Sequence, residues 1–87
     1  MTKQEQRENI LEALRYYKRV QDNDFGSYGW LWVSDLQFSV VKAMTGSLSE
    51  AKEETRIKRD LVIKHLAEQG YIRISKSGKM FKVLKTK

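Results

Sequence analysis

The sequence contains no cysteine, no proline and a single histidine. Without cysteine there is no disulfide framework, no thiolate metal site and no thiol chemistry. The longest apolar run, residues 30–33, is far shorter than the roughly 20 residues of a membrane-spanning helix. No apolar stretch follows the first residues, so no secretory signal is expected. We therefore expect an intracellular, cytoplasmic protein with no membrane partner.

Catalytic patterns are also missing. The 87 residues suffice for one domain and not for two with independent cores. The sequence has no Gly-rich phosphate loop, no acid–base pair beside a cleft-sized insertion and no nucleophile near a histidine. His65 has no cysteine or carboxylate at metal-ligand spacing. We expect a single domain over residues 1–87 that is not an enzyme and has no cofactor, no metal and no small-molecule effector.

Positive charge is concentrated toward the C-terminal end. The formal net charge is +6, and residues 56–87 hold ten basic side chains against two acidic ones. This segment therefore carries +8, and the rest of the chain sums to −2. A one-sided basic excess on a small folded domain indicates a polyanionic partner, nucleic acid before a membrane surface. A solvated charged surface without a partner is the plainer alternative.

The first half of the chain predicts two helices and a strand. Apolar residues at helical spacing, from Ile10 to Val20, predict a helix over residues 3–20 that begins at a Thr2–Glu5 capping box. Turn-forming residues then predict a loop over residues 21–29, and the large side chains of residues 30–33 predict a short strand. Its two tryptophans are expected to pack into the core, and the alternative is that they protrude together as a dimer or partner surface. Ser34 is the expected N-cap of a second helix over residues 35–44.

A third helix is expected over residues 49–69, with Gly70 after its end. No proline interrupts it, so one continuous helix is the economical prediction, and a bend near residues 54–55 is the alternative. The expected buried face consists of Ile57, Leu61, Val62 and Leu66, with Ile63 as a further candidate.

The clearest local pattern is a β-hairpin over residues 71–84. Two strand-like segments flank Lys76–Lys79, which favours a two-residue turn at Ser77-Gly78. The resulting cross-strand pairs are Ile72 with Val83, Arg73 with Lys82 and Ile74 with Phe81. Like charges directly opposite each other destabilise a hairpin. Their presence beside the tip lysines therefore indicates an anionic ligand, and a solvated hairpin face is the plainer alternative.

The order helix, strand, helix, helix, hairpin resembles the winged helix-turn-helix family of DNA-binding domains. The residues that carry the resemblance are Ser34-Asp35-Leu36 and the segment from Lys64 to Ile72, which reads Leu-x-x-x-Gly-aromatic-Ile before a basic hairpin. Such segments are similar to those of many small prokaryotic, viral and archaeal regulators. Over residues 8–84 the resemblance implies an α+β fold and a transcriptional regulator of viral or plasmid type that is associated with DNA.

The resemblance also implies a site on duplex DNA. Helix 49–69 would enter the major groove, and the hairpin would be the wing against phosphates or in a neighbouring minor groove. The helix candidates are Lys52, Thr55, Arg56, Lys58 and Arg59, of which Arg56 and Arg59 suit bidentate contacts to guanine. The wing candidates are Arg73, Lys76, Lys79 and Lys82. Ser34, at the N-terminus of the second helix, is a further phosphate-binding candidate, although a plain cap is its simpler role.

Two features depart from the family pattern, and one alternative function competes. Glu50, Glu53 and Glu54 would repel a phosphate backbone, and the expected third helix is longer than a usual recognition helix.

The alternative function is that of a winged-helix protein–protein module, which docks through an apolar patch of Tyr28, Trp30 and Trp32 without touching DNA. A DNA-binding form would be a homodimer joined through helix 3–20 or the Trp30–Trp32 strand, so that two half-sites are bound.

Overall fold

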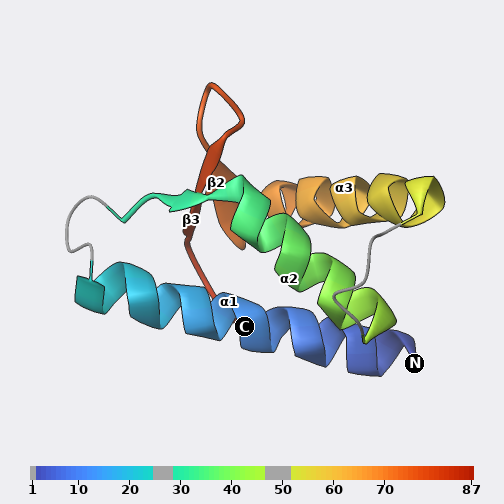
Figure 1. Ribbon diagram of the computed structural model, residues 1–87. Helices are drawn as coiled ribbons and strands as arrows, with labels where there is room; N and C mark the ends of the chain where they lie inside the picture. The colour runs from blue at the N-terminus through green and yellow to red at the C-terminus, as the bar shows by residue number, and fades with distance from the viewer. Residues whose placement is uncertain (1, 25–28, 47–51) are drawn as a thin grey trace.

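The computed structural model describes residues 2–24, 29–46 and 52–87, which form an α+β fold (Figure 1). The elements in chain order are α1 (Lys3–Asp24), β1 (Leu31–Trp32), α2 (Val33–Thr45), α3 (Glu53–Glu68), β2 (Ile72–Ile74) and β3 (Met80–Val83). This order is the expected winged-helix-like one. No helix within the described ranges has the length and apolar content needed to cross a bilayer.

The three strands form an antiparallel sheet in the order β1-β3-β2. The register of the hairpin is the predicted one, with Ile72 opposite Val83, Arg73 opposite Lys82 and Ile74 opposite Phe81. On its other side, β3 pairs with β1 through Leu31 opposite Phe81 and Trp32 opposite Met80. The hairpin strands are therefore tied to the segment that leads into α2.

The hairpin turn is longer than the two-residue turn that the sequence predicts. The Ser75 N–H donates to the Met80 carbonyl at 2.9 Å, and the Gly78 N–H donates to the Ser75 carbonyl at 2.9 Å. The loop is therefore the four residues Lys76–Lys79, with Gly78 at φ 76°. The Ser75 hydroxyl stabilises it by accepting from the Met80 N–H at 3.2 Å. Two- and four-residue loops leave the same pairs opposite each other, which is why the register is unchanged.

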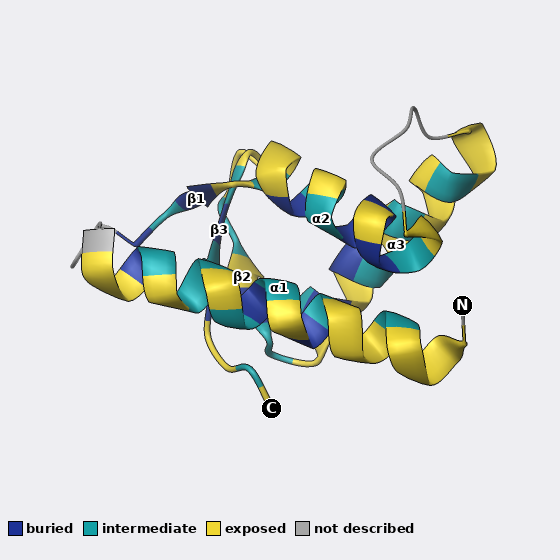
Figure 2. Cartoon of the chain, turned by 60° about the horizontal axis from the view of Figure 1, so that its bottom comes forward, coloured by how far each residue is buried: buried dark blue, intermediate teal, exposed yellow. Residues whose placement is uncertain are grey.

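The core lies between the helices and the inner face of the sheet (Figure 2). Leu14 of α1, Leu36 of α2 and Phe81 of β3 have no exposed surface. The Tyr17 ring packs edge-on against Phe81, with 5.5 Å between ring centroids. The buried cluster consists of Leu11, Leu14, Leu31, Leu36, Val40, Ile63, Leu66, Ile72, Phe81 and Val83. The hairpin face predicted to be apolar therefore supplies one wall of the core.

Helix α1 continues four residues beyond the predicted end at residue 20. Asp22 accepts a hydrogen bond from Lys18 Nζ at 2.8 Å, an i,i+4 ion pair that supports a helical turn. Gln21 is buried, and its side-chain amide is bonded to the backbone of Val83. These contacts outweigh the turn preference of the local sequence. Of the predicted loop, residues 25–28 lie outside the described residues.

Helix α2 begins at Val33, and its N-cap is Trp32, which makes no side-chain capping bond. The prediction that Ser34 caps this helix is therefore wrong, and Ser34 lies exposed in the first turn. The reason is that the Val33 N–H donates to the Lys79 carbonyl at 2.8 Å. A strand-like bond to the hairpin thus satisfies one of the first amides of the helix, which have no partner within the helix itself. At the other end, Gly46 is the C-cap in the left-handed conformation, and its N–H donates to the Lys42 carbonyl.

Helix α3 is rotated about its axis relative to the predicted orientation. Ile63 and Leu66 are buried, but Ile57 and Leu61 are 56% and 59% exposed, so the assignment of these two residues to the core is wrong. The buried residues lie in the C-terminal half of the helix, which packs against α2 and β2. The predicted helix start at residues 49–51 lies outside the described residues, and the helix ends at Glu68 rather than at residue 69.

Candidate nucleic-acid interface

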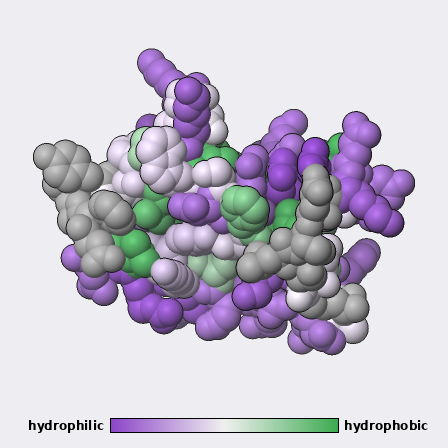
Figure 3. Space-filling model, in the orientation of Figure 1, coloured by the Kyte–Doolittle hydropathy of each residue, from purple (hydrophilic) through white to green (hydrophobic). Residues whose placement is uncertain are grey.

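The β-hairpin separates apolar from basic side chains on its two faces. Ile72, Phe81 and Val83 are buried on the inner face, whereas Arg73 is exposed and Lys82 half-buried on the outer face. The loop residues Lys76 and Lys79 are exposed. The sequence has no aspartate or glutamate after Glu68. In Figure 3 the hydrophilic tip of the hairpin stands clear of the rest of the surface, so an anionic ligand can approach it without meeting a carboxylate of the same hairpin.

Trp30, which precedes β1, and Trp32 within it lie on the outer face of the sheet, contrary to the prediction that they pack into the core. Leu31 is 8% exposed and packs inward, so its neighbours in the extended chain lie on the opposite face. Trp30 is half-buried there, and Trp32 is 56% exposed. Leu31 is the buried residue because it pairs with Phe81 of β3, which is fully buried.

Lys82 lies over the indole of Trp30, with its Nζ 4.9 Å from the ring centroid. A cation at this distance from an indole face is attracted by about 0.5–1 kcal/mol at an exposed site. That attraction offsets part of the repulsion between Lys82 and Arg73, which are directly opposite each other. The paired like charges are therefore accommodated by Trp30 as well as by any anion that binds the outer face.

The helix candidates are less uniformly placed than those of the hairpin. Lys52, Arg56 and Lys58 are exposed, and Thr55 is half-buried. The Arg59 side chain is 18% exposed, and its Nε donates to the Asp60 carboxylate at 3.0 Å. Thr55 and Arg59 precede Ile63 at four-residue spacing and therefore share its side of the helix. Arg59 is consequently held against the protein, whereas Lys58 is on the outward side with Ile57 and Leu61.

The hairpin and helix candidates do not form one compact cluster. The C-terminal end of α3 adjoins β2, and its N-terminal end, which carries Arg56, lies at the far end of the helix from the hairpin (Figure 1). Sixteen residues of helix span about 24 Å. A ligand that touches both sets must therefore be extended. Ser34, by contrast, is brought beside the hairpin, because its neighbour Val33 is bonded to Lys79.

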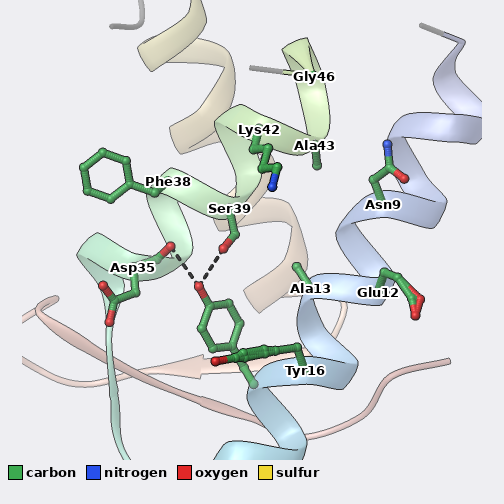
Figure 4. Close-up of a pocket in the computed structure, with 11 residues that line it drawn as sticks. Asn9, Glu12, Ala13, Tyr16, Asp35, Phe38, Ser39, Lys42, Ala43 and Gly46 are labelled. Atoms are coloured by element: carbon green, nitrogen blue, oxygen red, sulfur yellow. Dashed lines mark hydrogen bonds between the residues drawn. The ribbon is translucent and has the colours of Figure 1, made fainter. Parts of the chain in front are cut away.

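A second surface feature is a groove of about 700 Å³ between α1 and α2, shown in Figure 4. The Tyr17 hydroxyl donates to the Asp35 carbonyl at 3.0 Å and lies 2.6 Å from the Ser39 hydroxyl. Burial raises the pKa of Tyr17 above its ordinary value of 10.0, the Ser39 bond opposes this shift, and the charge of Asp35 adds to it. These bonds hold α1 and α2 together. Among the residues that line the groove, the basic one is Lys42, whereas the hairpin presents four cations.

No family model, curated protein or solved structure matches this chain. Among the described residues, no group of three or more histidine, cysteine, aspartate or glutamate side chains is placed to hold a metal ion.

The exposure of Trp32 on the outer face of the sheet is not predicted from the sequence. Trp32 and Met80 pair across β1 and β3 on that face, adjacent to the hairpin loop. Alternation along Trp30-Leu31-Trp32 is visible in the sequence, but all three side chains are large and apolar. Only the pairing of Leu31 with Phe81 decides which of them faces the core.

Proposed function

We propose that this protein binds duplex DNA through its C-terminal hairpin, as winged-helix transcriptional regulators do. The observation that carries the proposal is the hairpin itself, which buries one face in the core and presents Arg73, Lys76, Lys79 and Lys82 from the other face and the loop. Lysine and arginine contacts to phosphates supply most of the non-specific affinity of proteins for DNA. In this role the hairpin sets the position of the protein on the duplex.

Helix α3 supplies the contacts to bases in this proposal. Its exposed surface combines Arg56 and Lys58 with the aliphatic side chains of Ile57 and Leu61. Arginine suits guanine, and apolar side chains suit the thymine methyl group in the major groove. Arg59 contributes less than the sequence suggests, since Asp60 holds it and little of its side chain is exposed. Two copies would contact two half-sites, and sedimentation of the complex measures how many copies bind.

The alternative function, docking on another protein through an apolar patch, has weaker support. Tyr28 lies outside the described residues, and the Trp30 ring is covered on one side by Lys82. In the described part of the patch, Trp32 is therefore the exposed ring, with cations beside it. A docking surface for a protein is expected to be a larger contiguous apolar area.

The test is the affinity for a duplex measured against salt concentration. The logarithm of the binding constant of the wild type should fall steeply with log salt, by about 0.9 for each phosphate neutralised. A double variant, Lys76→Ala with Lys79→Ala, should bind more weakly to every sequence and should lower the slope by about 2. The matched control changes Lys3 and Lys42, which are exposed on α1 and α2, to alanine with the same loss of net charge.

The control variant should retain the slope of the wild type. Equal loss of affinity in both double variants would mean that net charge alone matters and would remove the hairpin from the mechanism. Absence of duplex binding by the wild type at low salt would refute the proposed function altogether.

A further inference from the structure

The outer face of the sheet combines an exposed indole with cations in a defined arrangement. Trp32 is 56% exposed and lies opposite Met80. Next to this pair, the N–H of Val33, the first residue of α2, donates to the carbonyl of Lys79 in the hairpin loop. In the other direction, Lys82 of β3 lies between Arg73 of β2 and the ring of Trp30, which precedes β1. Trp32 is thus flanked by the basic loop on one side and by Lys82 and Arg73 on the other.

We propose that this face binds a single-stranded DNA segment that continues from the bound duplex, with one base stacked on Trp32 and neighbouring phosphates on Arg73 and the loop lysines. The proposal rests on the duplex-binding function and names the substrate more closely, as a junction between duplex and single strand. An indole face next to lysine and arginine is the combination that holds unpaired bases, because every base has a flat face and every nucleotide a phosphate.

The charge distribution selects this occupant over the others. A base inside a duplex is stacked on both sides and cannot cover the Trp32 ring, so the base must be unpaired. A second copy of this chain would bring the same cations against Arg73 and Lys82, and like charges across an interface cost several kcal/mol. A protein partner would need acidic side chains placed around an aromatic one, whereas a nucleic-acid strand supplies phosphates at regular intervals.

The test compares a blunt duplex with the same duplex carrying a short oligothymidine tail at either 3′ or 5′ ends. For the wild type, one of the two tails should raise the affinity about tenfold, the magnitude of one stacked base. Trp32→Ala should remove this gain and keep the affinity for the blunt duplex, and Trp32→Phe should retain part of it. Phe38→Ala is the matched control, because Phe38 is a similarly exposed aromatic residue (65%) that lines the groove between α1 and α2.

A direct signal comes from the Trp30→Phe variant, in which Trp32 is the only tryptophan. Its fluorescence should be quenched by the tailed duplex and little affected by the blunt one. Equal gains from the tail in wild type and Trp32→Ala, or equal quenching by both duplexes, would overturn the inference and leave the duplex function standing. If instead the wild type binds oligothymidine and no duplex, the duplex function fails and so does the proposed junction.

Discussion

The side-chain amide of Gln21 forms two hydrogen bonds with the backbone of Val83, one in each direction. Its Nε2 donates to the Val83 carbonyl at 3.1 Å, and its Oε1 accepts from the Val83 N–H at 2.9 Å. In the register of β1 with β3, the residue opposite Val83 would be Gly29, two positions before Leu31. The Gln21 side chain takes the place of a backbone partner there, so α1 completes the hydrogen bonding of the sheet.

Gln21→Leu should therefore lower the free energy of unfolding by about 2–3 kcal/mol, since it leaves two buried backbone groups without partners. Urea denaturation measures the effect. The control is Gln37→Leu, the same exchange at a half-buried position of α2, which should change stability by about 0.5 kcal/mol or less. Equal denaturation midpoints for wild type and Gln21→Leu would show that the two bonds contribute nothing to stability.

Gly29→Ala should destabilise the protein more than Gly78→Ala does. Both glycines have positive φ values, 57° and 76°, so each alanine carries a backbone cost of about 1–2 kcal/mol. A Cβ at Gly29 would also lie 3.2 Å from Gln21 Cγ and 3.4 Å from Lys82 Cε, whereas nothing lies within 4 Å of one at Gly78. The difference between the two variants in thermal unfolding measures the crowding around Gln21. Identical losses would contradict this account of the contact.

Tyr17→Phe should lower stability at neutral pH by about 1 kcal/mol through the lost bonds to Asp35 and Ser39. Burial raises the pKa of Tyr17 in the folded state, so the unfolded chain releases this proton first. The associated stability is complete below the ordinary pKa and is lost as pH rises through the folded-state pKa. The stability difference between wild type and Tyr17→Phe should therefore shrink at alkaline pH. Tyr16→Phe, at a ring 49% exposed, is the control, and a gap that grew with pH would reverse the argument.

Arg56→Ala and Arg59→Ala should separate the base-contacting role of α3 from its structural role. Selection of binding sites from a random pool should show a changed preference at one position for Arg56→Ala, equivalent to about 1–3 kcal/mol. Arg59→Ala should return the motif of the wild type, because the Arg59 side chain is 18% exposed and bonded to Asp60. The opposite result would mean that Arg59 leaves Asp60 when DNA binds.

The hairpin could be predicted from sequence because its pattern is local. Alternation of apolar and basic residues on both sides of a Ser-Gly turn admits one register with a continuous apolar face. A turn two residues longer leaves that register unchanged, so the error in loop length moved no side chain to the other face. The pairing of Arg73 with Lys82 followed directly.

The orientations of α3 and β1 could not be predicted, since several apolar choices were compatible with each. In α3, Ile57 and Leu61 continue one helical stripe and Ile63 with Leu66 another, and only packing against α2 and β2 selects the second. At β1, the three large apolar residues 30–32 follow one another, and the pairing with Phe81 selects Leu31 for the core. The same contact exposes Trp32, which is why this part of the candidate site appears only in three dimensions.

Trp32 is at once the last residue of β1 and the residue that caps α2, so no residue between them is left to act as a hinge. The bond from the Val33 N–H to the Lys79 carbonyl fastens the same junction to the hairpin loop. The hairpin loop is therefore joined to the start of α2 by a hydrogen bond and without an intervening linker. A ligand bound at the hairpin loop is therefore placed directly beside the first turn of α2.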